Sequence, residues 1–69
     1  MNNIKIILKR QGRSQAWLAE HLGKSYVVTT NYCNNKTQPS VSTLYKIAGL
    51  LEVNVKELIG ATDRGLTNS

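Results

Sequence analysis

Residues 14–35 constrain the fold more than any other part of the chain, because they predict two short helices joined by a very tight turn. Ser14 can act as an N-cap, since its hydroxyl can accept one of the free amides that begin a helix. Gly23 suits the left-handed conformation that ends many helices, and Ser25 provides a second N-cap two residues later. The apolar residues between these signals fall on one helical face: Leu18, Ala19 and Leu22. The spacing is typical of a helix-turn-helix unit.

The second helix of this unit conflicts with its own local sequence. Residues 26–32 are β-branched, aromatic or polar, and in isolation they favour a strand. A single strand would have no partner in a chain whose other segments are helical. Because tertiary packing routinely overrides propensity, we expect a helix over residues 25–34.

Placing this helix at 100° per residue predicts which side chains point outward. With Thr29 directed inward, Val27 and Asn31 lie on the opposite face. The side chains expected within about 60° of Thr29 are Tyr26, Tyr32 and Cys33. The buried hydroxyl of Thr29 is expected to bond the carbonyl one turn back.

The outward face has two interpretations. Val27 and Val28 would suit contact with thymine methyl groups in a major groove. Asn31 can make two hydrogen bonds to adenine, which is worth about 1–3 kcal/mol of discrimination. The alternative is an incidental apolar surface pair beside a solvated asparagine.

The remaining segments predict three further helices. The first is capped by Asn2 or Asn3 and ends at Gly12, with Ile6 off its inner face, either partly exposed or in a subunit contact. Its inner residues are Ile4, Ile7 and Leu8. Ser40 caps the next long helix, whose apolar positions are Val41, Leu44, Ile47, Ala48 and Leu51.

The last helix opens at Asn54, which forms a capping box with Glu57, and it is expected to end at Gly60. Its apolar residues close the core or make a subunit contact: Val55, Leu58 and Ile59. Residues 61–69 show no periodicity and are expected to be a disordered tail.

Charge is distributed unevenly along the 69-residue chain, whose formal net charge is +5. The whole positive excess lies in residues 1–36, where Glu20 is the only acidic residue. The cations there are Lys5, Lys9, Arg10, Arg13, Lys24 and Lys36. Such a basic field favours a polyanionic partner, usually nucleic acid. The alternative is a basic surface that only keeps the protein in solution.

Size and composition exclude several classes of protein. A chain of 69 residues supports one small domain. One cysteine and one histidine can form neither an internal disulfide nor a structural zinc site. A hydrophobic core must therefore stabilise the fold, which suits a reducing compartment such as the cytoplasm. No stretch approaches the length of a membrane span and residues 1–5 do not open a signal peptide, so no membrane association is expected.

Several short motifs occur in an order that resembles one family. They are Gln15-Ala16-x-Leu18-Ala19-x-x-Leu22-Gly23 followed by Ser25, then Asn34-Asn35-Lys36 and Pro39-Ser40. Together they resemble the Cro/repressor-type, XRE-like helix-turn-helix regulators. The resemblance extends from about residue 4 to residue 59. It implies a compact, all-α, five-helix, lambda-repressor-like domain over residues 1–60, with the helix-turn-helix in helices two and three.

The resemblance, with the orientation argument above, indicates a sequence-specific double-stranded DNA interface. Base-reading positions on the recognition helix are Tyr26, Val27, Thr30 and Asn31. Positions expected near the DNA backbone are Arg13, Gln15, Trp17, Lys24, Val28, Asn34, Asn35, Lys36 and Thr37. Family members commonly dimerise near the last helix, so the subunit contacts expected are Val55, Leu58 and Ile59. The family further implies a bacterial or phage-encoded regulator, acting as a repressor and homodimer in the cytoplasm.

The chain departs from the family pattern at a few core positions. The family usually pairs an arginine with a glutamate where this chain has Leu8 and Cys33. Replacing both members of a buried ion pair by apolar groups is often neutral or stabilising, so both residues are expected in the core. Thr29 replaces a larger aliphatic residue. Asn35 stands in place of a glycine and is the next-best residue for a left-handed cap.

Other functions are weaker candidates. An antitoxin that neutralises a toxin and autoregulates is the main alternative, and RNA binding ranks third because few aromatic residues face outward. Trp17 and His21 form an i, i+4 pair, but no second carboxylate, hydroxyl–histidine pair or phosphate-binding glycine loop accompanies the histidine. Enzymatic activity and cofactors are therefore not expected.

Overall fold

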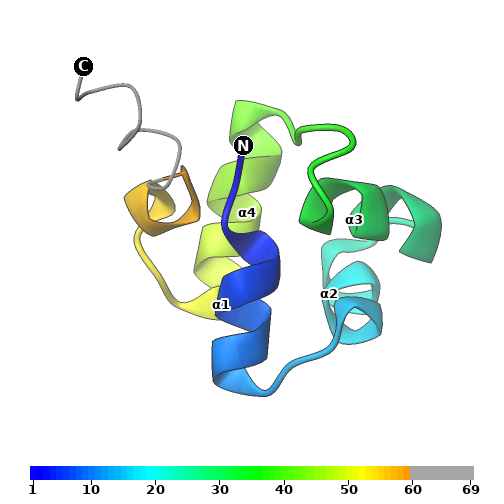
Figure 1. Ribbon diagram of the computed structural model, residues 1–69, viewed down its shortest axis with the longest axis horizontal. Helices are drawn as coiled ribbons and strands as arrows, with labels where there is room; N and C mark the ends of the chain where they lie inside the picture. The colour runs from blue at the N-terminus through cyan, green and yellow to red at the C-terminus, as the bar shows by residue number, and fades with distance from the viewer. Residues whose placement is uncertain (60–69) are drawn as a thin grey trace.

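The computed structural model describes residues 1–59 and contains no strand within them. The helices are α1 (Ile4–Gln11), α2 (Gln15–Leu22), α3 (Tyr26–Cys33) and α4 (Val41–Leu51), followed by a helical turn at residues 55–59. Figure 1 shows α2 and α3 on one side of α1 and α4, with residues 55–59 on the other side. This arrangement confirms the all-α fold. The helix end expected at Gly60 and the tail expected at residues 61–69 lie outside the described residues.

The predicted caps begin and end the helices where expected. The hydroxyl oxygens of Ser14, Ser25 and Ser40 accept hydrogen bonds from the third residue of α2, α3 and α4, at 2.9, 3.1 and 3.2 Å. Gly12 and Gly23 follow α1 and α2 with φ of 70° and 75°, a left-handed conformation that costs glycine little. The helix boundaries are therefore encoded locally.

Residues 26–33 form a helix despite their strand-like sequence, because packing stabilises it. α3 packs most extensively against α2 and also contacts α1. Ala19 on α2 is buried, and on α3 the buried residues are Thr29 and Cys33. The buried faces of α2 and α3 therefore pack together, and this packing stabilises α3 as a helix.

The core is formed by one cluster of apolar side chains from all the helices. Leu8 and Cys33 are both buried in it, which confirms their predicted core position. The other members are Ile4, Ile7, Leu18, Leu22, Ile47, Ala48, Leu51 and Leu58. Burial raises the pKa of the Cys33 thiol, and the Lys5 charge opposes that rise only in part. The thiol therefore behaves as a small core group.

The prediction that Val41 belongs to the inner face of α4 was wrong. Val41 is 70% exposed, whereas Thr43 is buried. Relative to the fully buried Ile47, Thr43 lies about 40° around the helix axis and Val41 about 120° away. The first apolar residue of α4 therefore projects into solvent.

The prediction that the Thr29 hydroxyl bonds the carbonyl one turn back was also wrong. Thr29 is fully buried, and its Oγ1 has no hydrogen-bond partner within residues 1–59. The residue thus fills an aliphatic position without satisfying its hydroxyl, which costs stability.

Hydrogen bonds connect the beginning of the chain to its last helical turn. The backbone N–H of Asn3 donates to the Leu58 carbonyl at 2.6 Å, and its side chain donates to the Glu57 carbonyl at 3.0 Å. Gln11 at the end of α1 donates to the Leu51 carbonyl at 2.8 Å. These contacts attach both ends of α1 to the following half of the molecule.

Candidate nucleic-acid interface

The outward face of α3 carries an unusual amount of exposed apolar surface. Tyr26, Val27 and Val28 are 56%, 64% and 38% exposed, while Thr29 is fully buried. The helix therefore has the predicted rotation, with Val27 opposite Thr29. Around the axis of α3, Tyr26 lies closer to the buried Thr29 than to Val27. Because it occupies the first turn of the helix, its ring nevertheless stays exposed. A helix end lacks the neighbouring turn that would cover such a ring.

Asn31 follows Val27 by one helical turn on the same face and is partly buried. Its backbone carbonyl accepts hydrogen bonds from the Lys36 and Thr37 amides, at 2.9 and 3.4 Å. Within the described residues its side-chain amide makes no hydrogen bond. Val27 and Asn31 thus present a methyl surface beside a free amide donor and acceptor, a combination suited to an A·T base pair.

Gln15 and Thr30 join the two helices of the unit. The Thr30 hydroxyl donates a hydrogen bond to Gln15 Oε1 across α2 and α3. Gln15 was predicted near the DNA backbone and Thr30 among the base-reading residues, and the structure brings them together. The contact uses the hydroxyl hydrogen of Thr30, which leaves its oxygen as an acceptor. It also orients the Gln15 side chain beside the exposed face of α3.

The loop after α3 offers fewer free donors than expected. The backbone amides of residues 34–37 all donate to carbonyls of residues 30–32. Asn35 has a φ of 62°, which confirms its predicted left-handed conformation. Its side-chain oxygen accepts from the Asn2 backbone at 2.7 Å. The groups left for a phosphate are therefore side chains of Asn34, Lys36 and Thr37, all exposed.

Asn2 fixes the position of this loop through hydrogen bonds. From the sequence, Asn2 was predicted only as a possible cap of the first helix. Its side chain donates to the Tyr32 carbonyl and to Gln38 Oε1, both at 2.9 Å. Its side-chain oxygen accepts from the Ile4 amide at 3.1 Å, whereas Asn3, at the N-cap position of α1, makes no capping hydrogen bond with its side chain. Gln38 in turn donates to Asn35 at 3.1 Å. No short-range pattern links residue 2 to residues 32–38, because these contacts depend on the tertiary fold.

Arg13 and Trp17 lie together but on a different side of α2 from Gln15. The Arg13 guanidinium lies 4.1 Å above the Trp17 ring, and that ring stacks on His21 at 4.4 Å. Arg13 also donates to Gln11 Oε1 at 3.1 Å. Trp17 follows Gln15 by two residues, about 200° around the helix axis. The stack therefore occupies a side of α2 other than the one that meets Thr30.

Exposed cations lie at both ends of α3. Lys24 precedes α3 and Lys36 follows it, and both are exposed. Lys5 reaches Asn34 Oδ1 at 3.2 Å and so adds charge near the end of α3. Positive side chains at both ends of an exposed helix favour contact with a polyanion.

The predicted subunit contact is altered in one respect. Leu58 is fully buried in the core of its own chain, which agrees with core closure, one of the two interpretations of the last helix, and excludes Leu58 from a subunit contact. The residue belongs to the same apolar cluster as buried side chains of α1 and α4. Val55 and Ile59 pack against the same core but stay partly exposed.

Within residues 1–59, no three His, Cys, Asp or Glu side chains come together in a way that could hold a metal ion. None of the helices in that range has the length and apolar character needed to cross a membrane.

Comparisons with known proteins agree with this geometry. The model of the helix-turn-helix family HTH_3 matches residues 4–58. The structure is similar to the crystal structure of a "putative DNA-binding protein" from Bacteroides fragilis, with a TM-score of 0.82 and 43% sequence identity. The match covers 84% of this chain and 94% of that chain. No curated protein matches the chain significantly.

Proposed function

Because the chain belongs to the helix-turn-helix family HTH_3, we propose that it is a transcriptional regulator that reads double-stranded DNA with α3. The observation that carries this proposal is the exposed apolar surface of Tyr26, Val27 and Val28 on a helix between exposed lysines. Exposed valines gain little from water, whereas thymine methyl groups in a major groove would cover them.

Each part of the surface has its own task in this proposal. Val27 and Asn31 read bases, with Tyr26 and Thr30 beside them, while Lys24, Lys36 and Thr37 position the helix on phosphates. Gln15 either touches a phosphate or acts through its hydrogen bond to Thr30. Asn35 holds the loop through Asn2, so its contribution to binding is indirect. Repression then follows if the bound site overlaps a promoter.

Two copies of the chain would bind two half-sites about one helical turn apart. One eight-residue helix reaches only a few base pairs, too few for a specific genomic site. A homodimer doubles the number of bases read. In this proposal the homodimer acts in the cytoplasm and binds DNA without a cofactor.

Selection of binding sites from random duplex DNA at a stated salt concentration tests the proposal. We expect a two-fold symmetric site, and Asn31→Ala should abolish the preference at one base position per half-site while non-specific binding is kept. Lys24→Ala is the matched control, since loss of a phosphate contact should weaken binding to all sequences and lower the salt slope by about 1. Selection of no site by the wild-type chain would refute sequence-specific binding. Co-purification of a small toxin would instead support the antitoxin alternative.

A further inference from the structure

The recognition helix contributes little to the apolar core that holds the other helices together. Within residues 1–59 the core cluster includes only Cys33 from α3, with the partly exposed Tyr32 packed against it. The other members come from α1, α2, α4 and the last helical turn: Ile4, Ile7, Leu8, Leu18, Leu22, Ile47, Ala48, Leu51 and Leu58. α3 also buries Thr29, whose hydroxyl has no hydrogen-bond partner in that range. Opening of α3 would therefore leave most of the cluster intact and return one hydroxyl to water.

The local sequence of α3 adds little helical stability of its own. Four of its eight residues are β-branched: Val27, Val28, Thr29 and Thr30. Such side chains lose rotamer freedom in a helix, which lowers their helix propensity. The helix has no acidic residue in its first turn and no basic residue in its last turn, so no side-chain charge offsets its dipole. Because eight residues are also marginal for an isolated helix, α3 depends on contacts with its neighbours.

Within residues 1–59, two side-chain hydrogen bonds attach α3 to other segments of the chain. Thr30 donates to Gln15 Oε1 on α2, and Asn2 donates to the Tyr32 carbonyl at 2.9 Å. Both bonds are only partly buried, so water can replace them when the helix opens. Packing against α2 and α1 supplies the remaining stabilisation.

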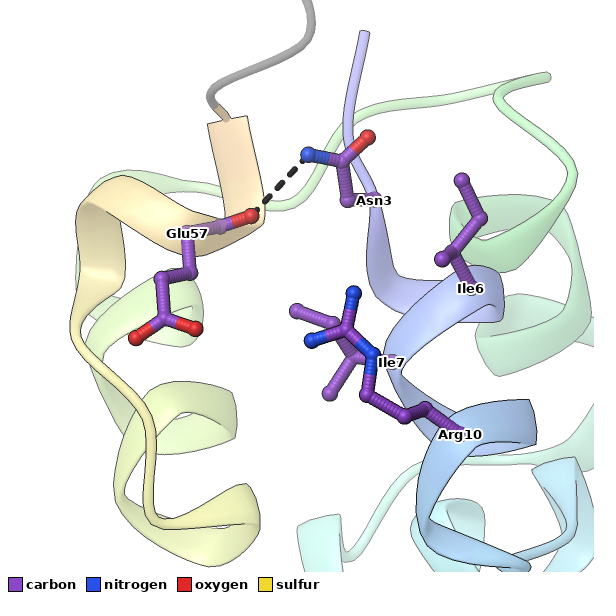
Figure 2. A pocket seen from close by; sticks show the side chains of 5 residues that line it. All are labelled: Asn3, Ile6, Ile7, Arg10 and Glu57. Carbon is purple, nitrogen blue, oxygen red and sulfur yellow. Dashed lines mark hydrogen bonds between the residues drawn. The ribbon is translucent and has the colours of Figure 1, made fainter.

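The opposite side of α1 is joined to the last helical turn through contacts that do not involve α3. Figure 2 shows the Asn3 side chain donating to the Glu57 carbonyl, at 3.0 Å, beside a groove of about 320 Å³. The groove lies between α1 and the last helical turn, and the residues that line it are Asn3, Ile6, Ile7, Arg10 and Glu57. In Figure 1 this turn and α3 lie on opposite sides of the molecule. Opening of α3 would therefore leave these contacts unbroken.

We propose that α3 opens locally in the free chain while α1 and α4 remain folded, and that DNA binding closes it. Local opening costs less free energy than global unfolding, because few buried contacts are broken. Val27 and Asn31 share one face only when α3 is helical. A duplex that contacts both residues therefore binds the closed form and shifts the equilibrium toward it. The part played by DNA rests on the proposed function, whereas the opening of α3 in the free chain does not.

Amide hydrogen exchange of the full chain, followed residue by residue by NMR without DNA, tests the opening. Under conditions in which exchange reports the opening equilibrium, we expect protection of residues 30–33 to be about tenfold or more below that of residues 45–51. Equal protection in the two helices would overturn the proposal.

Leu58→Val distinguishes local opening from global unfolding, because Leu58 lies in the last helical turn, on the side of the molecule opposite α3. It should lower protection in α4 about fivefold, since a buried methylene is lost, and leave protection in α3 unchanged. Thr29→Val is the matched comparison. It stabilises the closed helix against both local and global opening, so it should raise protection in α3 and α4 by a similar factor of about 5–30. A loss of protection in both helices from Leu58→Val would show that α3 unfolds only with the whole chain, and would overturn the proposal.

Addition of a pool of random-sequence duplexes at low salt tests the closing of α3 by DNA. We expect protection in α3 to rise about tenfold or more and to approach that of α4. Binding of the duplexes without any change in α3 protection would overturn this part of the proposal. Absence of binding would refute the proposed function instead, and the exchange measured without DNA would still decide whether α3 opens.

Discussion

Within the described part of the chain, Thr29 is the buried residue whose polar group is least suited to its surroundings. The residue is fully buried in α3, and its hydroxyl has no hydrogen-bond partner within residues 1–59. A polar group that leaves water without a new partner loses about 1–3 kcal/mol. Threonine has the same β-branched shape as valine, so the side chain fills the space at this position. Its hydroxyl, however, has lost its hydrogen bonds to water without gaining a new one.

We therefore expect Thr29→Val to raise the free energy of unfolding by about 1–2 kcal/mol, measured by urea denaturation. Thr43 provides a matched control, because it is also buried in a helix but its Oγ1 accepts a hydrogen bond from Ser40 at 3.0 Å. Thr43→Val should lower stability by about 1 kcal/mol. Equal effects of the two substitutions would mean that the Thr29 hydroxyl is satisfied in solution.

At the scale of helices, α2 and α3 form one unit because both packing and a hydrogen bond join them. The two helices pack extensively against each other, and Gln15 Oε1 accepts a hydrogen bond from the Thr30 hydroxyl. Each helix has only eight residues, a length that is marginal for an isolated helix. The two helices therefore depend on each other for stability, and the outward face of α3 depends on α2 for its rotation.

A double-mutant cycle should measure this dependence. We expect Gln15→Ala and Thr30→Val to show a coupling energy of about 0.5–1.5 kcal/mol in urea denaturation, since both variants remove the same hydrogen bond. As a control pair, Gln15→Ala combined with Val41→Ala should be additive, because Val41 is exposed on α4. Additive effects of the first pair would show that the Gln15–Thr30 hydrogen bond contributes no stability.

At the scale of the whole molecule, residues distant in sequence are joined by side-chain amides. Asn2 connects the start of the chain to the end of α3 and to the loop after it, and Gln11 connects α1 to the end of α4. A small domain has a limited apolar core, so a few such hydrogen bonds are a large fraction of its net stability. The position of the loop that carries Lys36 therefore depends on Asn2.

Asn2→Ala should lower the free energy of unfolding by about 2–3 kcal/mol, because it removes three side-chain hydrogen bonds. It should also weaken DNA binding without changing base preference, as the loop loses its support. The neighbouring Asn3→Ala removes one exposed side-chain hydrogen bond and should cost about 1 kcal/mol or less. Denaturation and binding assays on both variants check this difference. Similar losses from Asn2→Ala and Asn3→Ala would contradict the importance of the loop contacts.

Helix boundaries and the apolar side of most helices were predictable from short-range patterns. The hydroxyl of Ser14 or Ser25 caps the residues that directly follow it, and glycine tolerates a left-handed conformation wherever it stands. The rotation of α3, with Thr29 inside and Val27 outside, followed from helical periodicity once a helix was assumed. Such features involve neighbours along the chain, so local physical chemistry is enough to predict them.

Features that depend on distant neighbours emerged only with the tertiary structure. The missing partner of Thr29, the exposure of Val41, the burial of Leu58 and the amide contacts of Asn2 all depend on which segments lie beside them. The groove between α1 and Glu57 likewise joins residues more than 40 positions apart. Packing also makes residues 26–33 helical against their own propensity, since burial against α2 outweighs a preference of a few tenths of a kcal/mol per residue. Periodicity therefore determines which way a side chain points, and the folded chain determines what it meets there.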